Sequence, residues 1–244
     1  MSTWDGNNYY YSGQGVVLLA SRLLTGLPGP FRAIGNVSSL KLTVETSVLE
    51  HKESQTGQRG VDLRLTTETK CKLSMTLENF ISANLADALR GTTSTVEAGT
   101  AVAGSVSGGA VGDIVSLGVI GLTALTVTGK VRGTDYTANM DSGTIQWLTA
   151  QAGPSIVTSL TYNAFKRIDA LTNGVQEVYM RFEGLNTADG NKPVIVEVFK
   201  FSSDPLKELS LIGDGVEQFQ LEGNVLADAL QATGSKFFVT KMTR

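Results

Sequence analysis

Apolar and polar residues alternate over two neighbouring segments in the first third of the chain. Residues 38–48 are apolar at Leu40, Leu42, Val44 and Val48, and residues 61–75 are apolar at Val61, Leu63, Leu65, Cys71, Leu73 and Met75. Because strand side chains alternate between the two faces of a sheet, each segment predicts a strand with one apolar face. At about 3.3 Å per residue the second strand is about 50 Å long. The polar residues 51–60 between the segments, with two glycines, predict a long β-hairpin with a mobile tip.

The last third of the chain repeats this pattern. Residues 174–183, GVQEVYMRFE, and residues 193–201, PVIVEVFKF, flank the turn sequence LNTADGNK. They predict a second long hairpin, and residues 15–24 predict an earlier strand. Strands therefore dominate the predicted structure.

The pattern changes to a helical period after Met75. Leu77, Ile81, Leu85, Ala88 and Leu89 form one apolar stripe over residues 77–90. Thr76 is expected as the N-cap and Gly91 as the C′ residue. We expect this helix to cover the apolar face of the sheet.

Glycine, serine, threonine, alanine and valine dominate residues 92–165. No GK[ST] follows the glycines and no G-x-G-x-x-G opens a helix, so a nucleotide site is not expected. Short strands broken by glycine turns are expected there instead. The predicted organisation is an N-terminal arm at 1–14, a main domain at 15–91 and 166–244, and a β-rich insertion or subdomain at 92–165.

Charge and cysteine content narrow the possible functions. Twenty basic and 23 acidic residues give a net charge of −3, which does not favour binding to nucleic acid or to an anionic membrane. The single cysteine excludes an internal disulfide and fits a reducing compartment. The longest uncharged stretch, residues 114–129, is too short for a membrane span, and the N-terminus lacks a secretory signal. We expect a soluble protein, cytoplasmic where it is made.

The sequence offers little catalytic chemistry. Its one histidine, His51, lies in the polar hairpin loop, twenty residues before the only cysteine, Cys71. This spacing favours neither a catalytic triad nor a zinc site, and no calcium-binding pattern is present. Acidic pairs stay possible because sequence does not show which carboxylates meet. We expect no catalytic residue, metal or cofactor, and no enzymatic activity.

Several phrases together resemble the tail tube (major tail) proteins of long-tailed bacteriophages. They are GPFRAIGNVSSLKLTVET at the first hairpin, HKESQTGQR in its loop, LENFISANLADALRG after it, and KFSSDPLKELSLIGDGVEQFQLEGNVLAD near the end. The likeness covers residues 15–91 and roughly 162–239. It implies a mainly β fold, a tail-tube-like β-sandwich or barrel with two long β-hairpins, one packed α-helix and a β-rich insertion.

The resemblance also implies a virion location and a set of partners. Six copies would form a ring, and stacked rings would form a tube through which DNA passes into the host without specific binding. Tape measure, tail terminator and distal tail or baseplate proteins would be its partners, and no membrane would be bound. The loop expected to reach the adjacent ring is His51, Lys52, Glu53, Ser54, Gln55, Thr56, Gly57, Gln58 and Arg59.

The polar faces of the two hairpins would then line the lumen. The expected lumen-facing residues are Lys41, Glu45, Asp62, Arg64, Glu68, Lys70 and Lys72 on the first hairpin, and Glu177, Arg181 and Glu183 on the second. The facing of Glu197 is left open because Ile195 and Phe199 share its side. The first hairpin has four basic and three acidic residues on this face. With Glu197 included, the second hairpin has one basic and three acidic residues, so the net charge is −1 per copy. A nearly neutral bore suits a conduit.

Three other interpretations stay open. A monomeric β-barrel that binds a ligand or acts as an enzyme predicts a single species of the chain's own mass. An outer-membrane barrel is opposed by the absent signal peptide and lipid-facing band. The inner tube of a type VI secretion apparatus shares the stacked-ring arrangement.

Overall fold

The computed structural model describes residues 10–55 and 57–243. The first nine residues of the predicted arm, and Thr56 of the predicted loop, lie outside this part. The chain forms two compact units, one made of the residues up to Thr92 and from Asp169 on, the other of Thr93–Ile168. The predicted insertion spans 92–165. Each unit has its own core, and the chain is mainly β, as the alternating pattern predicts.

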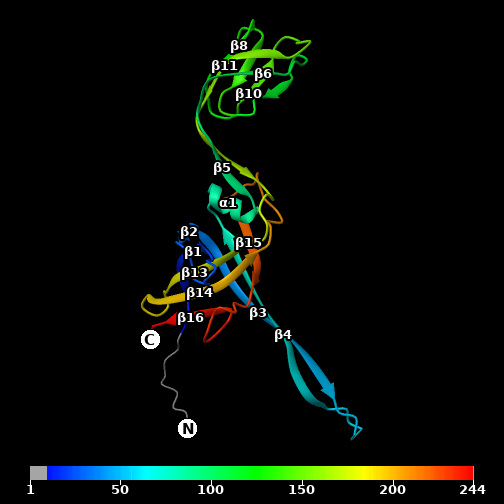
Figure 1. Cartoon of the computed structure of the whole chain (residues 1–244), viewed down its shortest axis with the longest axis vertical. Helices are drawn as coiled ribbons and strands as arrows, with labels where there is room; N and C mark the ends of the chain where they lie inside the picture. Colours follow the sequence, from blue (N-terminus) through cyan, green and yellow to red (C-terminus); the bar gives the residue numbers. More distant parts are fainter. Residues whose placement is uncertain (1–9, 56, 244) are drawn as a thin grey trace. The chain divides into compact units, whose positions relative to one another are not determined.

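An eight-stranded antiparallel sheet forms the first unit (Figure 1). Seven strands follow the order β2-β1-β13-β14-β15-β4-β3, and β16 pairs with β14 off this path. The two predicted long hairpins are present as β3–β4 and β13–β14. The strands are β1 (Gly13–Ser21), β2 (Arg32–Ala33), β3 (Val37–Lys52), β4 (Val61–Leu77), β13 (Glu177–Asn186), β14 (Lys192–Ser203), β15 (Phe219–Val225) and β16 (Phe238–Met242).

Alternation buries one face of this sheet. Buried side chains from five strands meet in one core, in which Leu73 and Met75 of β4, Met180 of β13 and Phe201 of β14 are at most 1% exposed. Cys71 joins them, and burial raises the pKa of its thiol. A buried thiol of this kind behaves as a small apolar side chain.

The single helix described, α1 (Ser82–Ala88), is shorter than predicted. Leu77 ends β4, where it pairs with Val37 and Phe219. The first residue of the expected helix therefore belongs to the sheet. The N-cap is Ile81, not Thr76, and it makes no side-chain cap bond.

The C-terminal end of α1 also differs from the prediction. Arg90, with φ of 46°, takes the C′ position that was expected for Gly91. The Gly91 N–H donates to the Ala86 carbonyl (2.8 Å), which makes Gly91 the C″ residue of a Schellman motif. The expected role of α1 is confirmed, because Ala88 and Leu85 pack on the core.

The second unit contains two three-stranded sheets and a two-stranded pair. Their orders are β7-β10-β9, β6-β11-β8 and β12-β5. Trp147 is fully buried, lies edge-on to Tyr136 with ring centroids 6.2 Å apart, and donates its indole N–H to the Ser107 carbonyl. The strands are β5 (Thr92–Val96), β6 (Gly99–Val106), β7 (Ile114–Ser116), β8 (Leu122–Val127), β9 (Tyr136–Asn139), β10 (Thr144–Trp147), β11 (Ser155–Tyr162) and β12 (Phe165–Asp169).

The turn between β9 and β10 requires glycine at Gly143. Its φ is 64°, and a Cβ built there would lie 1.6 Å from the Val119 carbonyl oxygen. A side chain would therefore collide with fixed backbone in a conformation that L residues disfavour. The glycine turns expected between short strands of this region thus include one at Asp141-Ser142-Gly143, where the glycine has a steric reason.

A buried ion pair fixes the segment between β15 and β16. Arg22 Nη2 lies 2.6 Å from Asp228 Oδ1, and the two side chains are 12% and 1% exposed. Burial alone would raise the pKa of Asp228. Hydrogen bonds from the Gln231 side chain, the Leu230 N–H and Arg22 outweigh it, so the pKa is lowered.

Replacement of Leu73 by alanine should destabilise the first unit alone. The change removes a fully buried side chain, which costs about 2–5 kcal/mol. Unfolding in urea followed by Trp147 fluorescence, in a Trp4→Phe background, reports on the second unit and should keep its midpoint. Far-ultraviolet circular dichroism should show an earlier transition for the first unit. A shifted Trp147 transition would contradict separate cores.

Replacement of Asp228 by asparagine should cost about 3–5 kcal/mol at pH 7, because it leaves Arg22 buried without a counter-charge. The folded pKa of Asp228 lies below its ordinary value of about 3.9, so its contribution is complete above about pH 4. The contribution is lost as the pH falls through the folded pKa. Urea unfolding at pH 7 and pH 3 should show a smaller difference between wild type and variant at pH 3.

Candidate functional site

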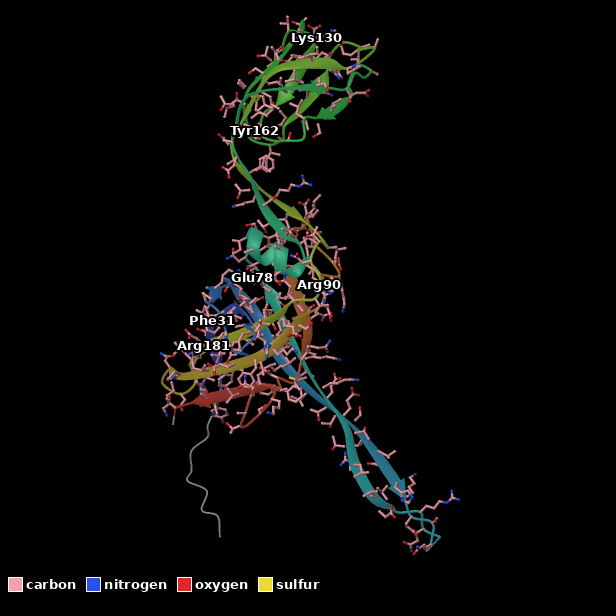
Figure 2. All side chains as sticks on the ribbon, viewed as in Figure 1. Phe31, Glu78, Arg90, Lys130, Tyr162 and Arg181 are labelled. Carbon is pink, nitrogen blue, oxygen red and sulfur yellow. The ribbon has the colours of Figure 1, made fainter. Side chains whose placement is uncertain are left out.

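The first hairpin extends beyond the rest of the sheet. β15 pairs with β4 only from Cys71 to Leu77, and in the described chain residues 45–52 and 61–70 pair only with each other. We call these two segments the free ribbon. Figures 1 and 2 show it leaving the sheet with no other element beside its side chains, all of which are exposed. Both edges and both faces are open to solvent.

A bulge in the free ribbon moves the apolar residues from one face to the other. Ser47 pairs with Glu68, and Val48 pairs with Thr66, so Thr67 has no partner. One unpaired residue shifts the alternation of β4 by one position. The single apolar stripe predicted along residues 61–75 is therefore wrong.

The shift produces two apolar patches. Val44 and Val48 continue the core face of the sheet and are 55% and 37% exposed. Leu65, opposite Leu49, and Leu63 lie on the other face. We call Leu49, Leu63 and Leu65 the distal patch, and these three side chains are 48–58% exposed.

Five of the predicted lumen-facing residues share the polar face of the first hairpin near the sheet. Cross-strand and same-strand ion pairs join Lys72 to Glu45 (3.2 Å) and Lys70 to Glu68 (3.0 Å). Lys41 lies on the same face by alternation along β3. Their position in an assembly stays a prediction.

Arg64 does not lie on this face, contrary to the alternation, and the register does not fix the facing of Asp62. Beyond the bulge Arg64 pairs with Glu50, at 3.6 Å, on the face opposite to Glu45. Asp62 is unpaired in the register, and its carboxylate oxygen lies 2.7 Å from His51 Nδ1. The bulges that move them leave no mark in the pattern of residue types.

The predicted loop is shorter than the sequence indicates. His51 and Lys52 are the last residues of β3, so the tip is limited to residues 53–60. The Glu53 N–H donates to the Gly60 carbonyl at its base (2.9 Å), and the Gln55 N–H donates to the Glu53 carboxylate. Ser54, Gly57, Gln58 and Arg59 are exposed, and Thr56 lies outside the described residues.

The second hairpin carries an ion-pair network on the face opposite the core. Arg181 contacts Glu183 (2.7 Å) and its cross-strand partner Glu197, and Lys241 of β16 lies 2.6 Å from the other oxygen of Glu197. Lys200 lies 3.0 Å from Glu177. Glu197 therefore shares the face of Arg181, which answers the question left open by the sequence.

Part of this second face is covered. Tyr179 and Phe199 form a small cluster with Ala20, and both rings are less than 10% exposed. Burial first, and then the charge of Glu197, raises the pKa of Tyr179 to about 12. The second hairpin is thus partly covered on the face that carries its charges.

The ion pairs make the polar face of the second hairpin more nearly neutral than its sequence tally of −2. On the second hairpin and its neighbour, Arg181, Lys200 and Lys241 balance Glu177, Glu183 and Glu197. The polar face of the first hairpin keeps three lysines against two glutamates, a charge of +1. Sequence analysis did not predict Lys241 as part of this network, because no pattern in the sequence indicates that β16 pairs with β14.

An open groove lies between β1 and β3. It has a volume of about 690 Å³ and an apolar lining of Val17, Val37, Leu40, Leu42, Phe182 and Val196. None of the described residues that line it is charged. We call it the β1–β3 groove. Alternation indicated the apolar side chains, but sequence did not show that the sheet leaves space between these strands.

Over residues 10–55 and 57–243, no group of three or more His, Cys, Asp and Glu side chains is placed to hold a metal ion. The described part of the chain also has no helix with the length and apolarity needed to cross a membrane.

Comparison with known proteins gives one result for the family. Residues 10–241 match the family described as "Protein of unknown function UCP028589". No curated protein matches the sequence. The match includes both units and the free ribbon.

Replacement of Glu197 by glutamine should destabilise the first unit by about 1.5–3 kcal/mol, because two cations lose a charged hydrogen-bond acceptor. The matched change Glu183→Gln removes a more exposed carboxylate and should cost less than about 1 kcal/mol. Urea unfolding of both variants at pH 7 measures the difference. Equal losses would show that Glu197 does not hold β16 through Arg181 and Lys241.

Proposed function

We propose that this chain, which belongs to the family described as "Protein of unknown function UCP028589", is a structural subunit of a phage tail tube. In this proposal six copies form a ring, rings stack into a tube, and DNA passes through the bore. The observation that carries it is the free ribbon, which exposes aliphatic side chains on both faces and leaves both edges unpaired in the described chain.

The free ribbon would gain stability from contacts with other copies for two physical reasons. An isolated two-stranded hairpin is at best marginally stable in water. Free strand edges also present backbone N–H and C=O groups that pair with any available strand. Neighbouring copies in the same ring and in the next ring would cover the faces and edges of the ribbon. Closure of the sheet into a cylinder would remove its free edges altogether.

The size of the expected bore fits duplex DNA. If each of six copies contributes the four strands of its two long hairpins, the cylinder has about 24 strands. At about 4.8 Å per strand and a tilt of about 40°, its backbone diameter is about 48 Å. Side chains reduce this to about 40 Å.

The electrostatics of the proposed lining favour passage over binding. Most charges on the two polar faces are paired with opposite charges, as in Lys72–Glu45 and Arg181–Glu197. A paired, nearly neutral surface offers few free cations to phosphate, so counterion release would contribute little affinity. Such a surface lets DNA slide.

A monomeric ligand-binding protein or enzyme has less support. The β1–β3 groove has polar side chains in Gln14, Asn36 and Ser38, but no charged residue lines it in the described chain, so it offers no acid or base for catalysis. The type VI inner tube shares the proposed geometry. The resemblance of loop and C-terminal phrases favours the phage tail.

Purified protein should form tubes with a central channel, visible by negative-stain electron microscopy. Replacement of Lys52, Glu53 and Arg59 by alanine should leave the monomer folded and abolish tubes, because these residues lie in the segment 51–59 that is expected to reach the next ring. Replacement of Arg132, Lys166 and Asp141 makes the same charge change in the second unit and should leave tubes intact. Tubes from the tip variant would contradict the stacking role, and wild-type monomers at high concentration would contradict the function.

A further inference from the structure

We infer that the free ribbon of one copy inserts its distal patch into the β1–β3 groove of a second copy. The inference rests on the proposed function and adds the receiving surface and the residues that enter it. It also assigns a purpose to the bulge at Thr67, which decides the face on which the patch lies.

The distal patch is a compact apolar knob. Leu49 and Leu65 lie opposite each other across the ribbon, and Leu63 lies two residues further on, opposite His51. Two residues of a strand span about 7 Å. Three leucines about half exposed at adjacent positions form a patch of the kind that marks an interaction site.

The β1–β3 groove matches this knob in polarity. Its lining includes Val17, Leu40, Leu42 and Phe182 beside the polar but uncharged Gln14, Asn36 and Ser38, and no charged residue lines it in the described chain. Uncharged leucines would bury apolar surface there without the desolvation of any ionised group. The groove is also long enough, because β1 extends about 13 Å from Gly13 to Val17.

Unpaired backbone borders the groove on two sides. β2 pairs with β1 only at Leu18 and Leu19, and the outer edge of β3 has no partner strand in the described chain. These N–H and C=O groups would pair with an incoming strand edge, as in β-strand addition. The free ribbon supplies such an edge along residues 61–70 of β4.

The ribbon of the same copy does not reach its own groove. Leu49 lies seven residues beyond Leu42 on the continuous strand β3, a distance of about 23 Å. β3 has no register break over this interval, because the shift between Ser47 and Val48 adds its extra residue to β4. A ribbon that enters this groove therefore belongs to a second copy.

The bulge makes this docking independent of the core face. Without Thr67, Leu63 and Leu65 would follow Cys71 and Leu73 on the face that carries Val44. With it they point the other way. One residue thus leaves Val44 and Val48 on the face that continues the core, and places the distal patch on the opposite face, beyond the paired charges proposed to line the bore.

Disulfide trapping between different copies tests the inference. Copies with Ser38→Cys, at the groove, are mixed with copies with Leu65→Cys, at the distal patch, and oxidised under conditions that give tubes. Covalent dimers should form in the mixture and at least ten-fold less in either variant alone. The native Cys71 is buried and should stay unreactive.

Deletion of Thr67 provides the second test. In a Leu65→Cys background it should lower the dimer yield at least ten-fold while the urea transition of the first unit is unchanged. Thr67→Ala keeps the residue count, so it should keep the bulge and the yield. An undiminished yield after deletion would overturn the role of the bulge.

Other outcomes separate the inference from the proposed function. Tubes without covalent dimers would overturn the docking and leave the tube intact. Monomers under every condition would overturn both. If dimers form only after removal of residues 1–9, the chain's own N-terminal segment occupies the groove and the inference is wrong.

Discussion

The pairing of β3 with β4 is the interaction on which the rest of the account depends. Fifteen residue pairs join the two strands, but only seven of the β4 residues have a second partner in β15. The inner part of the hairpin is held by a core and by strands on both sides of β4. The outer part has only its own cross-strand bonds, and its leucines and valines face water. A sheet with this shape gains most from additional strands and apolar surface supplied by another copy.

Ion pairs connect strands of the first unit outside its apolar core. Arg181, Glu197 and Lys241 connect β13, β14 and β16 across the face opposite the core, while Arg22 and Asp228 fix the chain between β15 and β16. These ion pairs hold strands that are distant in sequence without leaving uncompensated charge. The second unit has its own apolar core around Trp147, so its stability does not require the strands of the first.

Much of this fold follows from alternation alone. Leu73 and Met75 were predicted on an apolar strand face and are fully buried, and both long hairpins were predicted from period-two segments. The helix was overestimated because Leu77 fits a helical stripe and a strand equally well, and pairing with Val37 and Phe219 decides in favour of the strand. Periodicity cannot distinguish these outcomes at a boundary where the last strand residue and the first helix turn are both apolar.

Less of the candidate site than of the fold could be predicted from the sequence. Thr67 stands in a run of threonines that continues the alternating pattern, so its bulge and the reversed facing of Leu65 and Arg64 are visible only in the register. The β1–β3 groove and the Lys241–Glu197 pair depend on which strands meet, and that depends on the whole sheet. A local pattern predicts faces, whereas strand order determines what those faces contact.

Hydrogen exchange of the backbone amides in residues 45–52 and 61–70 tests the central claim most directly. The account predicts rapid exchange in dilute monomer, where the ribbon has only its own cross-strand bonds. It predicts strong protection of both segments once particles form, while the amides of Leu73 and Phe201 are protected in both states. Ribbon amides already protected in the monomer, or still unprotected in the particles, would contradict the claim that neighbouring copies complete this part of the sheet.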